Sequence, residues 1–384
     1  MAAVDERIRK TTLLESALRR PELGSIFGLA AVVFAFMIMT GPINVGLGEK
    51  NTFGDMWVRS VGVQSWVELA AYVGILAIAA AMLMIAGEFD LSIGANVALG
   101  GHTFAMLMMA PDPMPLWACI FATFAFMMFV GFITGSLVVS TGLPSFIVTL
   151  GFWFANRGFA NYLAFRNHDT SRLDIKPMLE ERNVLKDGEI IKMPDPTKID
   201  DIFAFKDGFF GWTGYIDLPF IEPFRLFFNA EFYYFIIIAL LAVFILNFTR
   251  IGNWIFASGG DPVAARAVGV PVARVKVGLF IWSAFSAGFL GVIFTLQSGV
   301  SEPLAGDFRE LHAIAAAVIG GCALTGGYGS VVGAVFGAFI FAIVSRGINF
   351  VPFIDNNLFR VILGLMLLGA AMLNQLLRNR VVKG

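Results

Sequence analysis

Residues 231–296 read EFYYFIIIALLAVFILNF (231–248), TRIGNWIFASGGDPVAARAVGVPVARVK (249–276) and VGLFIWSAFSAGFLGVIFTL (277–296). Each outer run holds roughly the 20 apolar residues that a helix needs to cross a hydrocarbon core about 30 Å thick. The linking segment between them carries the cations Arg250, Arg266, Arg274 and Lys276. The pattern predicts two membrane-crossing helices that are joined on the basic side of a bilayer.

The linking segment contains its own helix signals. Asp261 suits an N-cap, Pro262 suits the first helical position, and Gly269 suits the stop. A helix of about two turns is marginal in water by itself, so we expect it to pack against something. Two interpretations stand side by side: a docking element for a soluble partner, or a loop that only joins two spans.

The composition excludes a soluble globular protein. Hydrophobic residues make up 58% of the chain and charged residues 14%, whereas soluble domains carry about 25% charged residues. The formal net charge of −1 gives no basic field for nucleic acid. Cys119 and Cys322 lie in apolar runs and are interpreted as buried thiols. The three histidines show no metal-ligand spacing, and no cleavable signal sequence precedes the first apolar run.

Eight apolar runs are long enough to span a membrane, near residues 24–45, 66–86, 115–139, 143–165, 231–249, 277–298, 329–348 and 357–377. Two further runs, 91–110 and 311–326, are interrupted by glycine and polar residues. The sequence therefore predicts an all-α integral membrane protein with about ten transmembrane helices, eight being the alternative.

Basic residues near the ends and in the linking segment set the orientation. Ten crossings place residues 1–23 (N-terminal tail), 250–276 and 378–384 (C-terminal tail) in the cytoplasm. Residues 24–165 then form transmembrane helices 1–5 and residues 231–377 form helices 6–10. The polar segment 166–230 becomes a periplasmic insertion, whose aromatics, including Trp212 and Tyr215, predict an ordered cap or an interfacial hairpin.

Polar residues interrupt the apolar runs at two places. The segment Gly87–Gly94 holds Asp90 and Ser92, which are candidate N-caps for the next helix. It is either a capped turn or a broken helix beside a substrate path. Arg157 lies within a span, where we expect it to anchor at the outer interface rather than to act in transport.

The glycine-rich run Gly320–Ser330 is not a nucleotide-binding loop, because it lacks the Walker A lysine. Its continuation through Gly333 and Gly337 predicts close helix packing. Glu302, Asp307, Arg309 and Glu310 form one short charged loop that should face outward. The spans show neither a mid-membrane proton relay nor a nucleophile with its base, so an enzyme and a proton-coupled transporter are disfavoured.

Together these motifs resemble the permease subunits of bacterial monosaccharide ABC importers of the ribose/xylose/galactose type. The resemblance rests on Gly87–Gly94, Pro144–Gly151, Asn156–Gly158, Gly259–Val270 and Ala317–Ser330, in order along the chain. Glu88 and Phe89 depart from the Gly-Ile of the family, and the 166–230 insertion is longer than usual.

The resemblance implies a type II (vitamin-B12-importer-like) permease fold in the bacterial inner membrane, with both termini cytoplasmic. It also implies the partners: a second permease subunit (a second copy in a homodimer, or a close relative in a heterodimer), ABC ATPase subunits on the cytoplasmic face, and a periplasmic sugar-binding protein. This chain would bind no cofactor, and ATP-Mg would sit on the ATPase. The residues expected to couple to that ATPase are Asp261, Pro262, Ala264, Ala265, Arg266, Val268 and Gly269.

A path for a neutral monosaccharide calls for hydrogen-bonding side chains and aromatic faces. The candidate path residues are Asn96, Phe146, Thr149, Asn156, Gln297 and Ser298. Asn and Thr also hold helices together in membranes, so a purely structural role stays open for them. Other cargoes of the same family (a polyol, a furanose signal molecule or a nucleoside) and a secondary transporter remain as alternatives.

Overall fold

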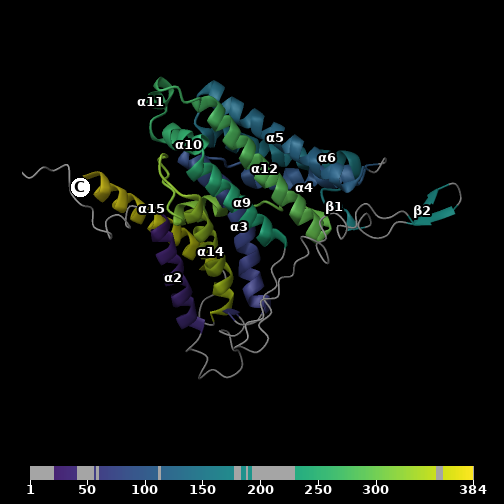
Figure 1. Cartoon of the computed structure of the whole chain (residues 1–384). Coiled ribbons are helices and arrows are strands. Elements are labelled where there is room, and N and C mark those ends of the chain that lie inside the picture. The colour runs from purple at the N-terminus through teal and green to yellow at the C-terminus, as the bar shows by residue number, and fades with distance from the viewer. Residues whose placement is uncertain are drawn as a thin grey trace, which may run out of the picture.

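The computed structural model describes residues 21–40, 56–57, 60–110, 114–176, 183–186, 189–192, 230–351 and 358–383. Within them the fold is a bundle of helices (Figure 1). The helices are α2 (Pro21–Thr40), α3 (Ser60–Ile85), α4 (Ile93–Met108), α5 (Leu116–Thr141), α6 (Ser145–His168), α9 (Ala230–Phe248), α10 (Arg250–Gly260), α11 (Pro262–Ala267), α12 (Val272–Ser298), α13 (Arg309–Ile319), α14 (Val331–Gly347), the 3₁₀ turn η4 (Ile348–Phe350) and α15 (Phe359–Lys383).

A helix lies at each of the ten apolar runs found in the sequence, and the two interrupted runs form the short helices α4 and α13. Six described stretches are long and apolar enough to cross a bilayer: 23–40, 62–85, 116–141, 231–248, 272–298 and 331–350. The chain is therefore a multi-pass membrane protein. That all ten helices cross the membrane stays a prediction.

Helix α3 forms the centre of the bundle. It packs against α9, α12, α13 and α14, and 94% of its apolar window is buried. In α9 the corresponding share is 33%, and Leu240, Phe244 and Phe248 point out of the molecule. Helices that are apolar on both their buried and their exposed faces suit a lipid environment. α3 begins at Ser60, before the apolar run that starts near residue 66, and the Ser65 hydroxyl within this first part donates to the carbonyl of Gly62 at 2.7 Å.

Helix α12 connects two ends of the bundle (Figure 1). It follows α11 at one end, and at the other it leads into β4 (Val300–Ser301), which pairs with β1 (Leu173–Asp174) in an antiparallel register. We call these the α11 end and the β1 end. The positions of the sites below are given relative to these two ends.

The first turn of helix α4 meets the non-helical segment that precedes α13. A Cβ at Gly306 would lie 1.8 Å from the carbonyl oxygen of Gly94, and a Cβ at Gly94 would lie 2.6 Å from that of Gly306. Only glycine permits this backbone contact. In the segment before α4, Glu88, Asp90 and Ser92 are buried in protein, which is the condition for irregular backbone at membrane depth. The segment before α13 is more open, since Leu304 and Phe308 are 64% and 51% exposed.

Small residues allow the closest helix contacts, as the sequence predicted for Gly333 and Gly337. A Cβ on Gly333 would come within 2.0 Å of the carbonyl oxygen of Gly320, and one on Gly337 would come equally close to that of Ala316. Helices α13 and α14 therefore touch through backbone rather than side chains. The predicted packing role of this stretch is confirmed.

Part of the 166–230 insertion is described. β2 (Asn183–Lys186) and β3 (Glu189–Lys192) form an antiparallel hairpin. Trp212 and Tyr215 lie outside the described residues, so the expected interfacial role of these aromatics stays a prediction.

The two cysteines are free and buried, Cys119 at 0% and Cys322 at 1% exposure. This confirms their interpretation as buried thiols. Over the described ranges, no group of three or more His, Cys, Asp or Glu residues is arranged to hold a metal ion.

Candidate functional site

The short helix α11 has the caps that its sequence predicts. The Asp261 side chain accepts hydrogen bonds from the backbone N–H groups of Val263 and Ala264 at 2.9 and 3.0 Å, and Pro262 occupies the first position. Gly269 has a φ of +87°, the left-handed conformation of a helix stop. The sequence reasoning missed α10, which precedes α11 and turns the linking segment into a two-helix element.

The surface of α11 is almost fully exposed. Val263 is 73% and Val268 is 80% exposed, whereas Ala265 is buried against the bundle. The capped helix and its C-cap residue thus display two apolar side chains. Figure 1 shows α11 at the tip of the α11 end. The remaining candidates Ala264, Arg266 and Gly269 are exposed as well, so the structure leaves either face of α11 open to a partner.

Below α11, three chain segments meet through glycine backbone. The N–H of Gly327 donates to the carbonyl of Ile85, the last residue of α3, at 2.8 Å. A Cβ on Gly259 of α10 would lie 1.8 Å from that same carbonyl oxygen, and one on Gly326 would lie 2.7 Å from the carbonyl oxygen of Gly259. We call Gly87, Gly259, Gly326 and Gly327 the glycine junction. It leaves little room for α10 to move independently of α3.

The break between α3 and α4 is held by Asp90. Its Oδ1 accepts from the backbone N–H and the hydroxyl of Ser92 at 2.8 and 2.6 Å, and its Oδ2 accepts from the Ser283 hydroxyl of α12 at 2.6 Å. Ser92 occupies the N-cap position of α4, but its side chain makes no capping hydrogen bond, so the predicted capping role of this side chain is wrong. Asp90 accepts from the Ser92 backbone N–H two residues ahead and so braces the turn that leads into α4.

Three candidate path residues take part in this buried framework. Asn156 of α6 donates to Asn96 of α4 at 2.7 Å, and Asn96 donates to Ser92 at 3.2 Å. Thr149 accepts from the backbone N–H of Leu91 at 3.0 Å. Asn96, Thr149 and Asn156 are all buried and hydrogen-bonded. Their observed contacts fit the structural role, which fastens α6 to the break.

An ion pair lies between the break and α12. Lys276 Nζ contacts Glu88 Oε1, and the two side chains are only 16% and 11% exposed. Glu88 is one of the residues that departs from the family pattern. In this chain the departure supplies a buried anion for a cation of the linking segment.

Arg157 does not anchor at an interface as expected. Its guanidinium pairs with Asp307 and its side chain is 13% exposed; it also stacks over the Trp153 ring at 4.7 Å. Buried charge inside a membrane protein calls for such a partner. The neighbouring Glu310 is likewise buried, in the first turn of α13 against Gly94, which corrects the expectation of a uniformly outward-facing charged loop.

At the β1 end a polar pocket of about 490 Å³ opens between α3, α12 and the segment before α13. Its lining residues are Glu68, Tyr72, Arg172, Phe294, Gln297, Ser298, Val300, Glu302, Ala305 and Arg309. Two candidate path residues, Gln297 and Ser298, thus lie together here, apart from the buried Asn96–Asn156 framework. Phe146 lies with neither group: it is 51% exposed on the outer face of α6.

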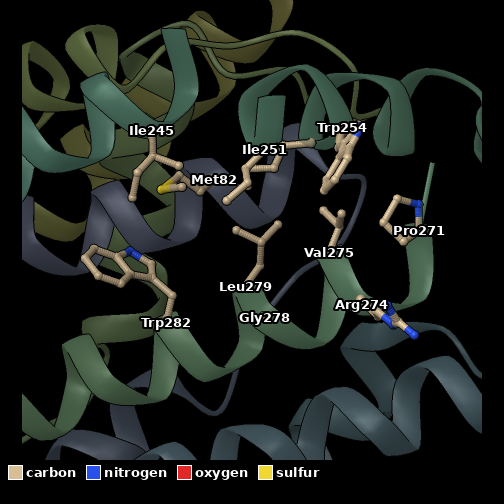
Figure 2. Close-up of a pocket in the computed structure, with 11 residues that line it drawn as sticks. Met82, Ile245, Ile251, Trp254, Pro271, Arg274, Val275, Gly278, Leu279 and Trp282 are labelled. Carbon is tan, nitrogen blue, oxygen red and sulfur yellow. The ribbon is translucent and has the colours of Figure 1, made fainter. Parts of the chain in front are cut away.

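A second cavity, of about 420 Å³, lies near the α11 end between α3, α9, α10 and α12. Figure 2 shows Met82, Ile245, Ile251 and Leu279 directed into it, while the Arg274 side chain lies at its edge and points outward. This mainly apolar lining has few partners for the hydroxyl groups of a sugar. The cavity lies between part of α10 and α12.

Residues 62–371 match a family described as the permease component of the branched-chain amino acid transport system. The chain belongs to this family. Membership explains the multi-pass helical architecture and identifies a transport permease rather than an enzyme.

Relatives of this permease cover most of its length. It is 28% identical over 322 residues to a fructose import permease protein of Rhizobium meliloti, covering 82% of this chain and 77% of the relative. A xylose transport system permease protein of Escherichia coli is 28% identical over 373 residues (88% and 92%). A ribose import permease protein of Escherichia coli is 26% identical over 275 residues (72% and 74%). The predicted resemblance to monosaccharide importer permeases is confirmed. No solved structure matches this chain.

Sequence reasoning missed several residues that shape these sites in the permease. Tyr72 and Glu231 belong to long apolar runs, where the surrounding sequence does not indicate a role for them. Gly259 is part of a motif, but the motif does not predict its backbone contact. Tyr72 Oη lies 2.6 Å from Gln297 Oε1, 225 residues further along the chain. No local spacing announces a contact over that separation.

Proposed function

We propose that this chain is the transmembrane permease subunit of an ATP-driven ABC importer that moves a monosaccharide into the cytoplasm. The observation that carries the proposal is α11: a capped, exposed helix with apolar side chains, joined directly to α12 in a chain of a permease family. The names of the relatives support the sugar as cargo.

In this proposal α11 docks in an ABC ATPase, which binds ATP-Mg, while this chain binds no cofactor. The α11 end then faces the cytoplasm of a bacterial inner membrane and the β1 end faces the periplasm, with both termini cytoplasmic. A periplasmic binding protein delivers the sugar at the β1 end. A second copy of this chain completes the complex, in the type II arrangement with ten spans per subunit.

The glycine junction supports a mechanical role for this contact. Closure of the ATPase would displace α11 and α10, and Gly259 would press directly on the carbonyl end of α3. A backbone contact without intervening side chains transmits such a displacement with little slack, because packed backbone cannot change rotamer.

The first experiment separates an ABC importer from a secondary transporter. We expect proteoliposomes that contain this chain, the co-purified ATPase and the binding protein to take up labelled D-fructose, D-xylose or D-ribose only when ATP is supplied. Uptake down a gradient without the ATPase or ATP would overturn the proposal.

The family description favours a second cargo, a branched-chain amino acid. The same proteoliposomes should therefore be offered L-leucine. ATP-driven uptake of leucine with none of a sugar, polyol or nucleoside would replace the monosaccharide by this second candidate.

The docking role of α11 is tested by Val263→Asp, with Val263→Thr as a control of similar shape. Asp is favourable in the first turn of a helix, so α11 should stay folded while its exposed surface gains a charge. We expect Val263→Asp to lose most ATPase co-purification and uptake, and Val263→Thr to keep both. Equal co-purification of the two variants would exclude Val263 from the interface.

Gly269→Val and Ala265→Asp test the coupling of ATP hydrolysis to uptake, but the second also disturbs the fold. Ala265 is 4% exposed, so an aspartate there places a charge inside the bundle and damages the subunit itself. Gly269→Val forces a β-branched residue to a φ of +87°. We expect it to uncouple ATP hydrolysis from uptake while the protein remains in the membrane; normal sugar-stimulated hydrolysis and uptake would contradict this.

A further inference from the structure

We propose that the polar pocket at the β1 end is a recognition site for the neutral sugar before it enters the membrane, with Tyr72 and Arg309 as the residues that bind its hydroxyl groups. The inference rests on the proposed function and adds a site to it. The pocket has a volume of about 490 Å³, which lies within the range of ligand pockets, roughly 300–1,000 Å³.

The first argument is an excess of hydrogen-bond acceptors. The Tyr72 hydroxyl has a single proton, and it lies 2.6 Å from Gln297 Oε1 and 2.7 Å from Glu68 Oε1. The Gln297 amide nitrogen is already directed at Glu231, at 2.8 Å. One proton cannot serve both oxygens, so at least one acceptor of this group is available to a ligand that donates hydrogen bonds.

The second argument is an available donor. Over the described chain, the Arg309 guanidinium makes no ion pair or hydrogen bond, and its contact is with the ring of Phe294, 5.3 Å away. Arg309 offers several N–H donors in a fixed plane. A sugar hydroxyl both donates and accepts, so it is matched to a pocket with free acceptors on one side and free donors on the other.

The third argument concerns charge and shape. Arg172 and Arg309 balance Glu68 and Glu302, so the lining carries no net charge and favours a ligand without one. The rings of Tyr72 and Phe294 meet edge to face with centroids 4.6 Å apart. They supply the apolar surface that the C–H face of a sugar ring requires.

The pocket also leads into the bundle. Arg309 is the first residue of α13, and the next residue, Glu310, lies against Gly94 where α4 begins. A ligand bound to Arg309 would therefore lie next to the place where the first turns of α4 and α13 meet. The pocket thus adjoins the irregular backbone that precedes these two short helices.

The test uses the complete complex in proteoliposomes, with labelled D-fructose, D-xylose and D-ribose as probes. Tyr72→Phe removes only the hydroxyl and keeps the ring contact with Phe294. Tyr162→Phe, on the exposed face of α6, is the matched control. We expect Tyr72→Phe to lower uptake at limiting sugar by about tenfold, because the site then loses a hydrogen-bonding group. The control should behave as the wild type does.

Arg309→Gln should also lower uptake, and Arg309→Lys should restore part of it. If the wild type takes up a sugar and both Tyr72→Phe and Arg309→Gln do so at its rate, the pocket is not a recognition site, although the proposed function stands. If the wild type takes up none of the three sugars in the presence of ATP, the proposed function fails and this proposal fails with it.

Discussion

At the α11 end, three chain segments meet through glycine backbone, whereas at the β1 end charged and aromatic side chains surround an open pocket. The Lys276–Glu88 pair near the first end is 16% and 11% exposed. The Arg172–Glu302 pair at the second end is 64% and 52% exposed, with Arg172 Nε 3.5 Å from Glu302 Oε1. Force transmission needs tightly packed contacts, and ligand recognition needs polar side chains that a ligand can reach. The difference between the ends matches the two tasks proposed for them.

The largest effect on stability is expected for Lys276→Met, which tests the contribution of the buried ion pair near the α11 end. Removing one member of a buried ion pair leaves the other charge without a partner, at a cost of about 3–5 kcal/mol. We expect the midpoint of thermal unfolding of the detergent-purified subunit to fall sharply. The double variant Lys276→Met/Glu88→Gln should recover most of the loss. An unchanged midpoint for the single variant would show that the pair contributes nothing to the stability of the α11 end.

The next largest effect is expected for Gly259→Ala, with Gly260→Ala as its matched control. A Cβ at Gly259 meets the Ile85 carbonyl oxygen at 1.8 Å, whereas a Cβ at Gly260 meets nothing within 4 Å. Overpacking of this kind costs about 1–3 kcal/mol. The same thermal measurement should therefore separate two neighbouring glycines of one helix. Identical midpoints would contradict a tight glycine junction.

The smallest effect on stability is expected for the exposed Arg172–Glu302 pair at the β1 end. Arg172→Gln removes one member of the exposed pair, and such pairs contribute about 0–1 kcal/mol. We expect the thermal midpoint of the subunit to stay close to that of the wild type, and to respond weakly to added salt. A loss as large as that of Lys276→Met would mean that the two ends do not differ in rigidity.

Hydropathy alone predicts the helices at the ten apolar runs, because a long apolar run has one favourable conformation in a membrane. The caps of α11 were also predictable, since Asp261, Pro262 and Gly269 act within a few residues of the helix they bound. Helix α10 was not, because glycine at positions 252, 259 and 260 is typical of a loop unless close backbone contacts explain it.

The candidate sites show the same division between local and distant effects. Asp307 contacts Arg157 from 150 positions further along the chain. Local spacing cannot pair two residues at that separation, so the pattern around Arg157 alone predicts an interfacial anchor. Asn96, Thr149 and Asn156 were chosen for polarity alone. Polarity cannot distinguish a side chain that meets a substrate from one that fastens two helices.

The buried cysteines have a practical consequence. Cys119 and Cys322 are the only thiols in the chain, and neither is exposed by more than 1%. A cysteine introduced at Val263 should react with a maleimide spin label or fluorophore far faster than either natural thiol. The environment of that label on α11 can then be followed spectroscopically on an otherwise natural sequence, during turnover and without a cysteine-free background.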